Sequence, residues 1–167
     1  MEHDKAFQDH YPPEVAHCFG CGYLNPLGHQ IKSYWHGDVS ICRFTPRPEH
    51  IAIPGYVYGG LIASILDCHG TGTAAAAMYR EQGRPMGSQP PLRFVTASLH
   101  VDFLKPTPMG AELEARAVVE EVKGRKVIVN EELYAGDLLC ARGRVVAVVA
   151  PDHLYNGCNS SSPNCCA

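Results

Sequence analysis

The sequence predicts an α+β domain in which one long helix lies on one face of an antiparallel sheet. An apolar run from about Val57 to Arg80 has helical spacing. Residues 93–104 then alternate apolar and polar side chains, which indicates a half-buried strand. Three further strand-like segments follow, joined by short glycine-containing links: 111–122, 126–134 and 138–149.

The remaining segments can be placed in chain order. Residues 1–17 are polar and contain Pro12-Pro13, which predicts a loose arm with at most a short helix. Residues 18–28 are rich in turn-forming residues. Two short strands, 29–35 and 38–44, flank a predicted hairpin turn at His36-Gly37. Loops are expected at 46–54 and 83–91, and a disordered low-complexity tail at 151–167, so the domain itself is expected to span residues 18–150.

Composition excludes several classes of protein. The 167 residues suffice for one domain, and a net charge of -3 with scattered basic residues gives no footprint for nucleic acid. The polar, acidic start does not resemble a signal peptide, and no apolar run is long enough to span a membrane. We therefore expect a cytoplasmic protein that does not bind membranes, with its eight cysteines reduced.

The start of the predicted helix carries the clearest functional signal. Gly59-Gly60 open the helix, where unpaired backbone N–H groups and a partial positive charge can hold an oxyanion. Two turns later Asp67 stands alone among apolar residues, where a carboxylate is costly to desolvate unless it is used or paired. Together these features indicate chemistry at a carbonyl group. The alternatives are close packing at the glycines and an Asp67 that only pairs with a neighbour such as His69.

Residues 18–150 resemble the hotdog-fold acyl-CoA thioesterases, in which five or six curved antiparallel strands wrap a long central helix. Tyr58-Gly59-Gly60 with Asp67 matches the His-Gly-Gly…Asp signature, with the carboxylate spaced as in the phenylacetate-degradation type. A second match is a strand ending in an aromatic, a Pro-x-Pro break and a glycine, Phe94–Gly110. A third is the opening Cys-Phe-Gly-Cys-Gly-x-x-Asn-Pro-x-Gly at 18–28.

The resemblance implies hydrolysis of acyl-CoA to free acid and CoA, with no cofactor. The Gly59 N–H would polarise the thioester carbonyl, and Asp67 would act as general base or as nucleophile. Gly60 and Tyr58 would contact substrate. Tyr58 departs from the family pattern, since a histidine usually stands there, and this changes the expected shape of the pocket.

The spacing of the two main residues predicts an oligomer. Gly59 and Asp67 are eight residues apart, or about 12 Å along a helix, so they cannot both reach one carbonyl carbon from one chain. A two-fold axis with antiparallel helices would pair the oxyanion donor of one subunit with the acid of the other. We expect a homodimer, or a dimer of dimers that would be a homotetramer.

Three more residues are candidates for substrate contacts. Thr71 lies one turn beyond Asp67 on the same helix face, and Thr96 lies in the strand where some relatives carry a threonine that contacts substrate. Either hydroxyl could hold the attacking water or the thioester sulfur, although a threonine in a strand is also explained by β propensity. The amide of Asn25 could reach the pocket, or Asn25-Pro26 could simply form a turn. His69 is expected at the surface or at an interface.

Cys18 and Cys21 form a lone Cys-x-x-Cys pair. A structural zinc would need two more ligands, such as His17 or the tail residues Cys158, Cys165 and Cys166. Because the tail lacks ordering signals, we expect no metal site. A redox dithiol is disfavoured because no thioredoxin-like βαβ pattern surrounds the pair.

Two other functions share this fold. An acyl-thioester hydratase or dehydratase usually pairs a histidine with an acid, and Tyr58 stands where that histidine would be. A non-catalytic acyl-CoA-binding sensor tends to lose the helix carboxylate and to add a DNA-binding segment. Asp67 is present, and the 17 residues before the domain are too few for a helix-turn-helix.

Overall fold

The computed structural model describes residues 5–151 and residue 154. It contains one α-helix, α1 (Gly59–Glu81), and three short 3-10 turns, η1 (Phe7–His10), η2 (Pro13–Val15) and η3 (Pro48–His50). The strands are β1 (Ser33–His36), β2 (Val39–Phe44), β3 (Phe94–Phe103), β4 (Leu113–Lys123), β5 (Lys126–Ala135) and β6 (Leu138–Val149).

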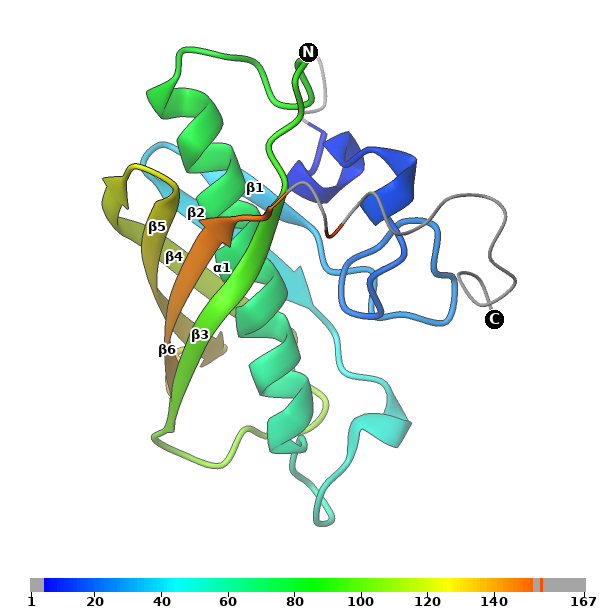
Figure 1. Cartoon of the computed structure of the whole chain (residues 1–167). Coiled ribbons are helices and arrows are strands. Elements are labelled where there is room, and N and C mark those ends of the chain that lie inside the picture. Colours follow the sequence, from blue (N-terminus) through cyan, green and yellow to red (C-terminus); the bar gives the residue numbers. More distant parts are fainter. Residues whose placement is uncertain (1–4, 152–153, 155–167) are drawn as a thin grey trace.

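The six strands form one antiparallel sheet in the order β1-β2-β4-β5-β6-β3. This sheet wraps around α1, which contacts every one of the strands (Figure 1). The predicted architecture of a long helix wrapped by a curved antiparallel sheet is confirmed. The first strand to follow the helix, β3, lies at one edge of the sheet and pairs only with β6.

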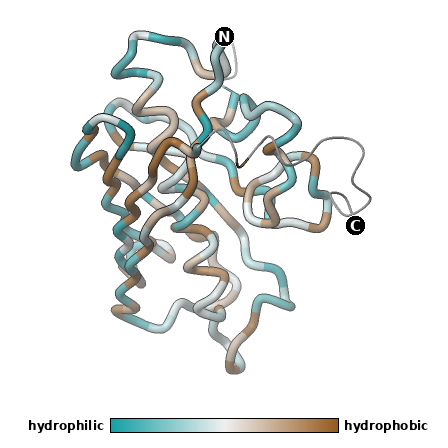
Figure 2. Tube along the Cα trace, in the orientation of Figure 1, coloured by the Kyte–Doolittle hydropathy of each residue, from teal (hydrophilic) through white to brown (hydrophobic). Residues whose placement is uncertain are grey.

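Most of the core lies between α1 and the concave face of the sheet. Alternation places every second residue of the strands inward, and Figure 2 shows apolar and polar residues alternating along them. The first half of the helix buries Leu61, Ile65 and Leu66 against larger side chains, while its second half packs small residues such as Ala74 and Ala77 against valines of β5 and β6.

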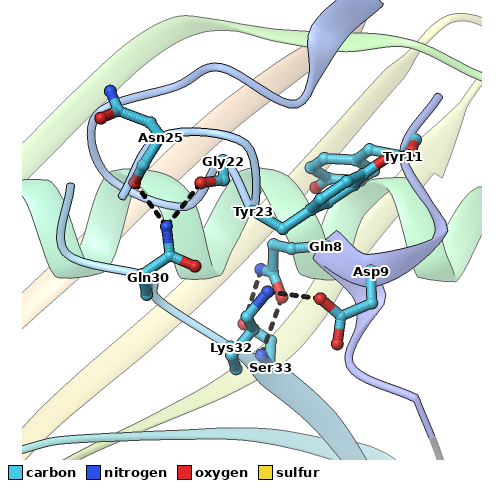
Figure 3. Close-up of polar contacts among 9 residues, drawn as sticks. All are labelled: Gln8, Asp9, Tyr11, Gly22, Tyr23, Asn25, Gln30, Lys32 and Ser33. Atoms are coloured by element: carbon cyan, nitrogen blue, oxygen red, sulfur yellow. Dashed lines mark hydrogen bonds and ion pairs between the residues drawn. The ribbon is translucent and has the colours of Figure 1, made fainter. Parts of the chain in front are cut away.

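The N-terminal segment is packed rather than loose, so the expectation of a loose arm is wrong for residues 5–17. Phe7 is 4% exposed and stacks on Trp35 with ring centroids 5.2 Å apart. Gln8 is fully buried, and it donates to Ser33 Oγ (3.0 Å) and accepts from the Ser33 N–H (2.9 Å). Figure 3 shows these bonds beside the ion pair of Lys32 with Asp9. The short polar segment therefore packs against the helix and the sheet.

His69 is also placed differently from expectation, since it is completely buried instead of lying at the surface. Its Nδ1 lies 2.8 Å from Ser33 Oγ, and its Nε2 lies 3.5 Å from Ser40 Oγ. Desolvation lowers the pKa of His69 to about 4. The ring thus belongs to a polar network that ties α1 to β1, β2 and, through Gln8, to the N-terminal segment.

The first strand is shorter than predicted because residues 29–32 contact the preceding turns and do not join the sheet. Gln30 has a positive φ of 57°, and its side-chain amide donates to Gly22 O (2.7 Å) and Asn25 O (2.6 Å), as drawn in Figure 3. The predicted tail lies outside the described residues except for 151 and 154. Within the described part of the chain, none of the helices has the length and apolarity needed to cross a membrane.

Candidate active site

Asp67, Thr96 and Thr71 form a connected chain of hydrogen bonds. Thr96 Oγ1 lies on β3 and donates to Asp67 Oδ1 at 2.6 Å. The Thr71 and Thr96 hydroxyls are 2.8 Å apart. No hydrogen bond to Asp67 Oδ2 occurs within the described residues, so this oxygen is available to another donor. The structure thus brings together the acid and both threonines that the sequence singled out.

An irregularity in β3 accompanies this arrangement. The register with β6 shifts between Thr96 and Ser98, which leaves Ala97 as an extra, exposed residue. Bulges of this kind bend a strand locally and redirect its side chains. Thr96, immediately before the shift, contacts the helix, whereas Ala97 and Ser98 face solvent. The bulge therefore helps to fix the hydroxyl that orients Asp67.

A cavity of about 330 Å³ lies beside this chain of hydrogen bonds. Asp67, Thr71 and Thr96 all line it, together with apolar residues of the N-terminal segment, α1 and β3. The apolar part of the lining includes Pro12, Val15, Ala75, Leu92, Phe94 and Val95. A mostly apolar cavity with a few convergent polar groups is the usual form of a small-molecule site.

The helix start lies apart from this cavity in the same chain. Tyr58 is the residue before the helix, and its side chain makes no capping hydrogen bond. Its ring instead lies against Gly60, where a Cβ would be 2.4 Å from Tyr58 Cε2. The backbone N–H groups of Gly59 and Gly60 have no hydrogen-bond partner among the residues described. These two N–H groups can therefore receive an oxyanion.

Asn25 does not line the cavity. Its Nδ2 donates to His17 O at 3.2 Å, and its Oδ1 accepts from the Leu27 N–H at 3.2 Å. Both ends of the amide are thus engaged in shaping the turn before Gly28. The turn interpretation explains this residue without a contact to substrate.

Glu131 is a second carboxylate near the site that the sequence analysis missed. It points from β5 toward α1, is 2% exposed, and neither of its oxygens has a hydrogen-bond partner in the described part of the chain. A Cβ on Gly70 would lie 2.9 Å from Glu131 Oε2, so the glycine in mid-helix makes room for this carboxyl group. Burial raises the pKa of Glu131 well above its ordinary value, and the charge of Asp67 raises it further.

The family of this chain follows from its similarity to known proteins. A family model for the thioesterase superfamily matches residues 54–141, just over half of the chain. The chain belongs to the thioesterase superfamily. The matched range contains the helix start, Asp67, Thr71 and Thr96, but not the N-terminal segment that lines one side of the cavity.

Solved members of the superfamily share the architecture. A thioesterase superfamily protein from Shewanella loihica is 48% identical, with 86% of this chain and 99% of that chain covered and a TM-score of 0.66. A phenylacetic acid degradation-related protein from Ralstonia eutropha is 18% identical, covers 72% of this chain and 86% of its own, and has a TM-score of 0.61. At that lower identity the likeness shows the hotdog fold alone.

A curated relative is the acyl-coenzyme A thioesterase THEM4 of Xenopus laevis, which is 32% identical over 97 residues. The match covers 58% of this chain and 38% of the relative. The chain thus spans about two fifths of the length of that relative.

Proposed function

We propose that this protein hydrolyses acyl-CoA thioesters to a free acid and CoA. The observation that carries the proposal is the Asp67 carboxylate, which lies on the wall of an apolar cavity with one oxygen held by Thr96 and the other without a partner among the residues that the structure describes. Membership of the thioesterase superfamily and the likeness to an acyl-CoA thioesterase support this assignment.

In the proposed reaction, the free oxygen of Asp67 takes a proton from a water molecule. The water oxygen attacks the thioester carbonyl carbon, and the resulting oxyanion accepts hydrogen bonds from the N–H groups at the start of α1. The C–S bond then breaks, and the CoA thiolate takes up the proton from Asp67. The alternative for the first step is direct attack by Asp67, which would form an anhydride that water then hydrolyses.

The two alternatives for Asp67 can be separated by a single turnover in water enriched in oxygen-18. If Asp67 is the nucleophile and water opens the anhydride at the Asp67 carbonyl carbon, the heavy oxygen enters the Asp67 carboxylate, and mass spectrometry of the peptide around residue 67 detects it. A general base places the label in the product acid only.

The hydrolysis proposal is tested with a panel of acyl-CoAs and a reagent that reports free thiols. Asp67→Asn keeps the shape of the side chain and its bond with Thr96 but removes the base, so kcat should fall by about 10²–10⁴-fold. Asp137→Asn is the matched control, because Asp137 is an exposed carboxylate in the turn between β5 and β6 and does not line the cavity.

Three outcomes contradict the proposal. Equal activity of wild type and Asp67→Asn removes Asp67 from the reaction. Tight binding of acyl-CoA without thiol release in either protein indicates a binding protein. Loss of enoyl-CoA absorbance without thiol release indicates a hydratase.

We further propose that the active unit is a homodimer formed along β3. The chain of β3 runs antiparallel to α1, because Thr96 near its start meets Asp67 and Phe103 at its end meets Gly59. The outer edge of β3 has no partner strand in the described part of the chain. Two such edges paired antiparallel about a two-fold axis would bring the Thr96 end of one chain to the Phe103 end of the other.

This pairing would complete the site with groups from both subunits. Each Asp67 would then face the Gly59 N–H of the partner, which one chain alone cannot provide over about 12 Å of helix. Phe103, at 57% exposure, would be covered by the same contact. Sedimentation velocity with parallel assays tests the idea, and an active monomer at low concentration would contradict it. A dimer of dimers, the domain limits and a cytoplasmic location stay predictions from the sequence.

A further inference from the structure

Three cysteine thiols meet where the turn-rich segment after η2 touches α1. Cys18 and Cys21 come from that segment, and Cys68 comes from the helix, one residue after Asp67. Their Sγ atoms all lie within 4.8 Å of one another, and those of Cys18 and Cys68 are 3.9 Å apart. The helix thus supplies a ligand that the Cys-x-x-Cys pair lacked in the sequence.

The spacing of the sulfurs fits a tetrahedral metal ion. Zinc binds thiolate sulfur at about 2.3 Å, which places two sulfurs of a tetrahedral site about 3.8 Å apart. The 3.9 Å between Cys18 and Cys68 is close to that value, and nearly twice the sulfur separation in a disulfide, about 2.05 Å. Small side-chain adjustments would bring all three sulfurs to one ion.

The surrounding backbone is shaped around these sulfurs. A Cβ on Gly20 would lie 2.2 Å from Cys68 Sγ, so a larger residue at position 20 would exclude this sulfur from the cluster. The backbone N–H groups of Gly20 and Cys21 are directed at the Cys18 sulfur. Backbone N–H groups directed at a thiolate are the kind of outer contact that orients metal ligands.

We propose that Cys18, Cys21 and Cys68 bind one zinc ion through three thiolates. All three cysteines line the same cavity as Asp67, so the fourth coordination position would face that cavity and hold a water molecule. The ion would fasten the turn-rich segment to α1 immediately beside Asp67. The zinc proposal does not depend on the proposed hydrolysis, because the metal content of the protein can be measured whether or not the protein cleaves acyl-CoA.

The test uses the full-length protein, purified without chelators and with a phosphine reductant, followed by elemental analysis. The expected result is one zinc per chain in the wild type. Cys18→Ser should lose it, and because Cys18 is exposed this variant should still fold. Cys140→Ser is the matched control, since the Cys140 thiol only donates to Leu138 O at 3.3 Å and lies outside the cluster.

Cobalt substitution gives a second readout that does not depend on activity. Cobalt bound by three thiolates should give strong sulfur-to-metal charge-transfer absorption and the intense visible bands of a tetrahedral site, both absent in Cys18→Ser and Cys68→Ser. A wild-type protein without zinc or these bands overturns the proposal. So does a mass about 2 Da lower before reduction, which would reveal a disulfide in the cluster.

Discussion

The first turn and the middle of α1 offer opposite kinds of chemistry. At Gly59 and Gly60 the helix has no side chains, and its functional groups are backbone N–H groups open to the outside. Two turns later the functional groups are side chains: Asp67 is held by Thr96 of β3, and the N-terminal segment lines the opposite side of the cavity. The first turn therefore offers backbone donors, while the middle of the helix holds a carboxylate in one orientation.

After the loss expected for Asp67→Asn, the largest expected effect is at the first turn. Gly59→Pro removes the N–H with little backbone strain, because proline is well tolerated at the first helical position and Tyr58 already has the extended conformation (φ −73°, ψ 145°) that precedes proline. We expect kcat to fall by about 10²–10³-fold if this N–H is the oxyanion donor. Gly59→Ala is the control: it keeps the N–H and places a Cβ 3.3 Å from the exposed Phe103 ring. Equal losses in both variants would point to packing instead.

A mixture of two inactive variants tests whether the two regions serve one site across subunits. In a dimer of one Gly59→Pro chain and one Asp67→Asn chain, one of the two shared sites is intact. Random reassortment of equal amounts should therefore restore about a quarter of wild-type activity. No recovery after exchange, with mixed dimers verified by native mass spectrometry, would place each site within a single chain.

A smaller effect is expected at the hydrogen bond that holds the base. Thr96→Val keeps the strand propensity but removes the donor to Asp67, which should lower kcat by about tenfold, the size expected for a bond to a charged group. Thr71→Val should cost less, since Thr71 contacts Thr96 and not Asp67. Steady-state kinetics of both variants make the comparison, and a larger loss at Thr71 would reverse their order.

The smallest expected effect concerns the contribution of Glu131, which lies beneath the middle of the helix, to the stability of the protein. The folded-state pKa of Glu131 is raised, so the folded protein loses stability as pH rises from the unfolded pKa toward the folded one, by at most about 1.4 kcal/mol per pH unit. The charge of Asp67 on α1 raises the pKa of Glu131, and the charge of Glu131 contributes to the raised pKa of Cys42 on β2. Because the glutamine of Glu131→Gln stays neutral, the free energy of unfolding of this variant should increase relative to that of the wild type as pH rises.

Urea unfolding of both proteins between pH 5 and pH 9 measures this difference. A gap in unfolding free energy that is constant with pH would mean that Glu131 does not titrate in that range.

The helix and the four strands after it were predictable to within about two residues. Their periodicity reflects a single inner face, and glycine-containing links mark most of their ends. Asp67 was predictable as a candidate from its place after Gly59-Gly60, Thr71 because it shares a helix face with Asp67, and Thr96 because some members of the resembling family carry a threonine there. Their actual contacts needed the structure, since the bulge at Ala97 cannot be read from residue types.

The features that sequence reasoning missed depend on contacts between distant segments. Cys68 joins Cys18 and Cys21 only because the turn-rich segment folds onto α1 at Gly20. His69 is buried because Gln8 and Ser33 provide partners from other elements. For Glu131 a signal did exist: it alternates in phase with the buried Val127, Val129 and Leu133, which indicates an inward side chain.

The packed N-terminal segment lines the cavity but lies outside the part of the chain that matches the superfamily. Tyr11, Pro12 and Val15 form one wall of the cavity, yet they lie outside the range 54–141 that the superfamily shares. If the proposed function holds, changes in this short stretch would reshape the space offered to an acyl chain without moving Asp67 or the helix start. Selectivity could then be engineered by exchanging a few N-terminal residues while the helix and sheet stay unchanged.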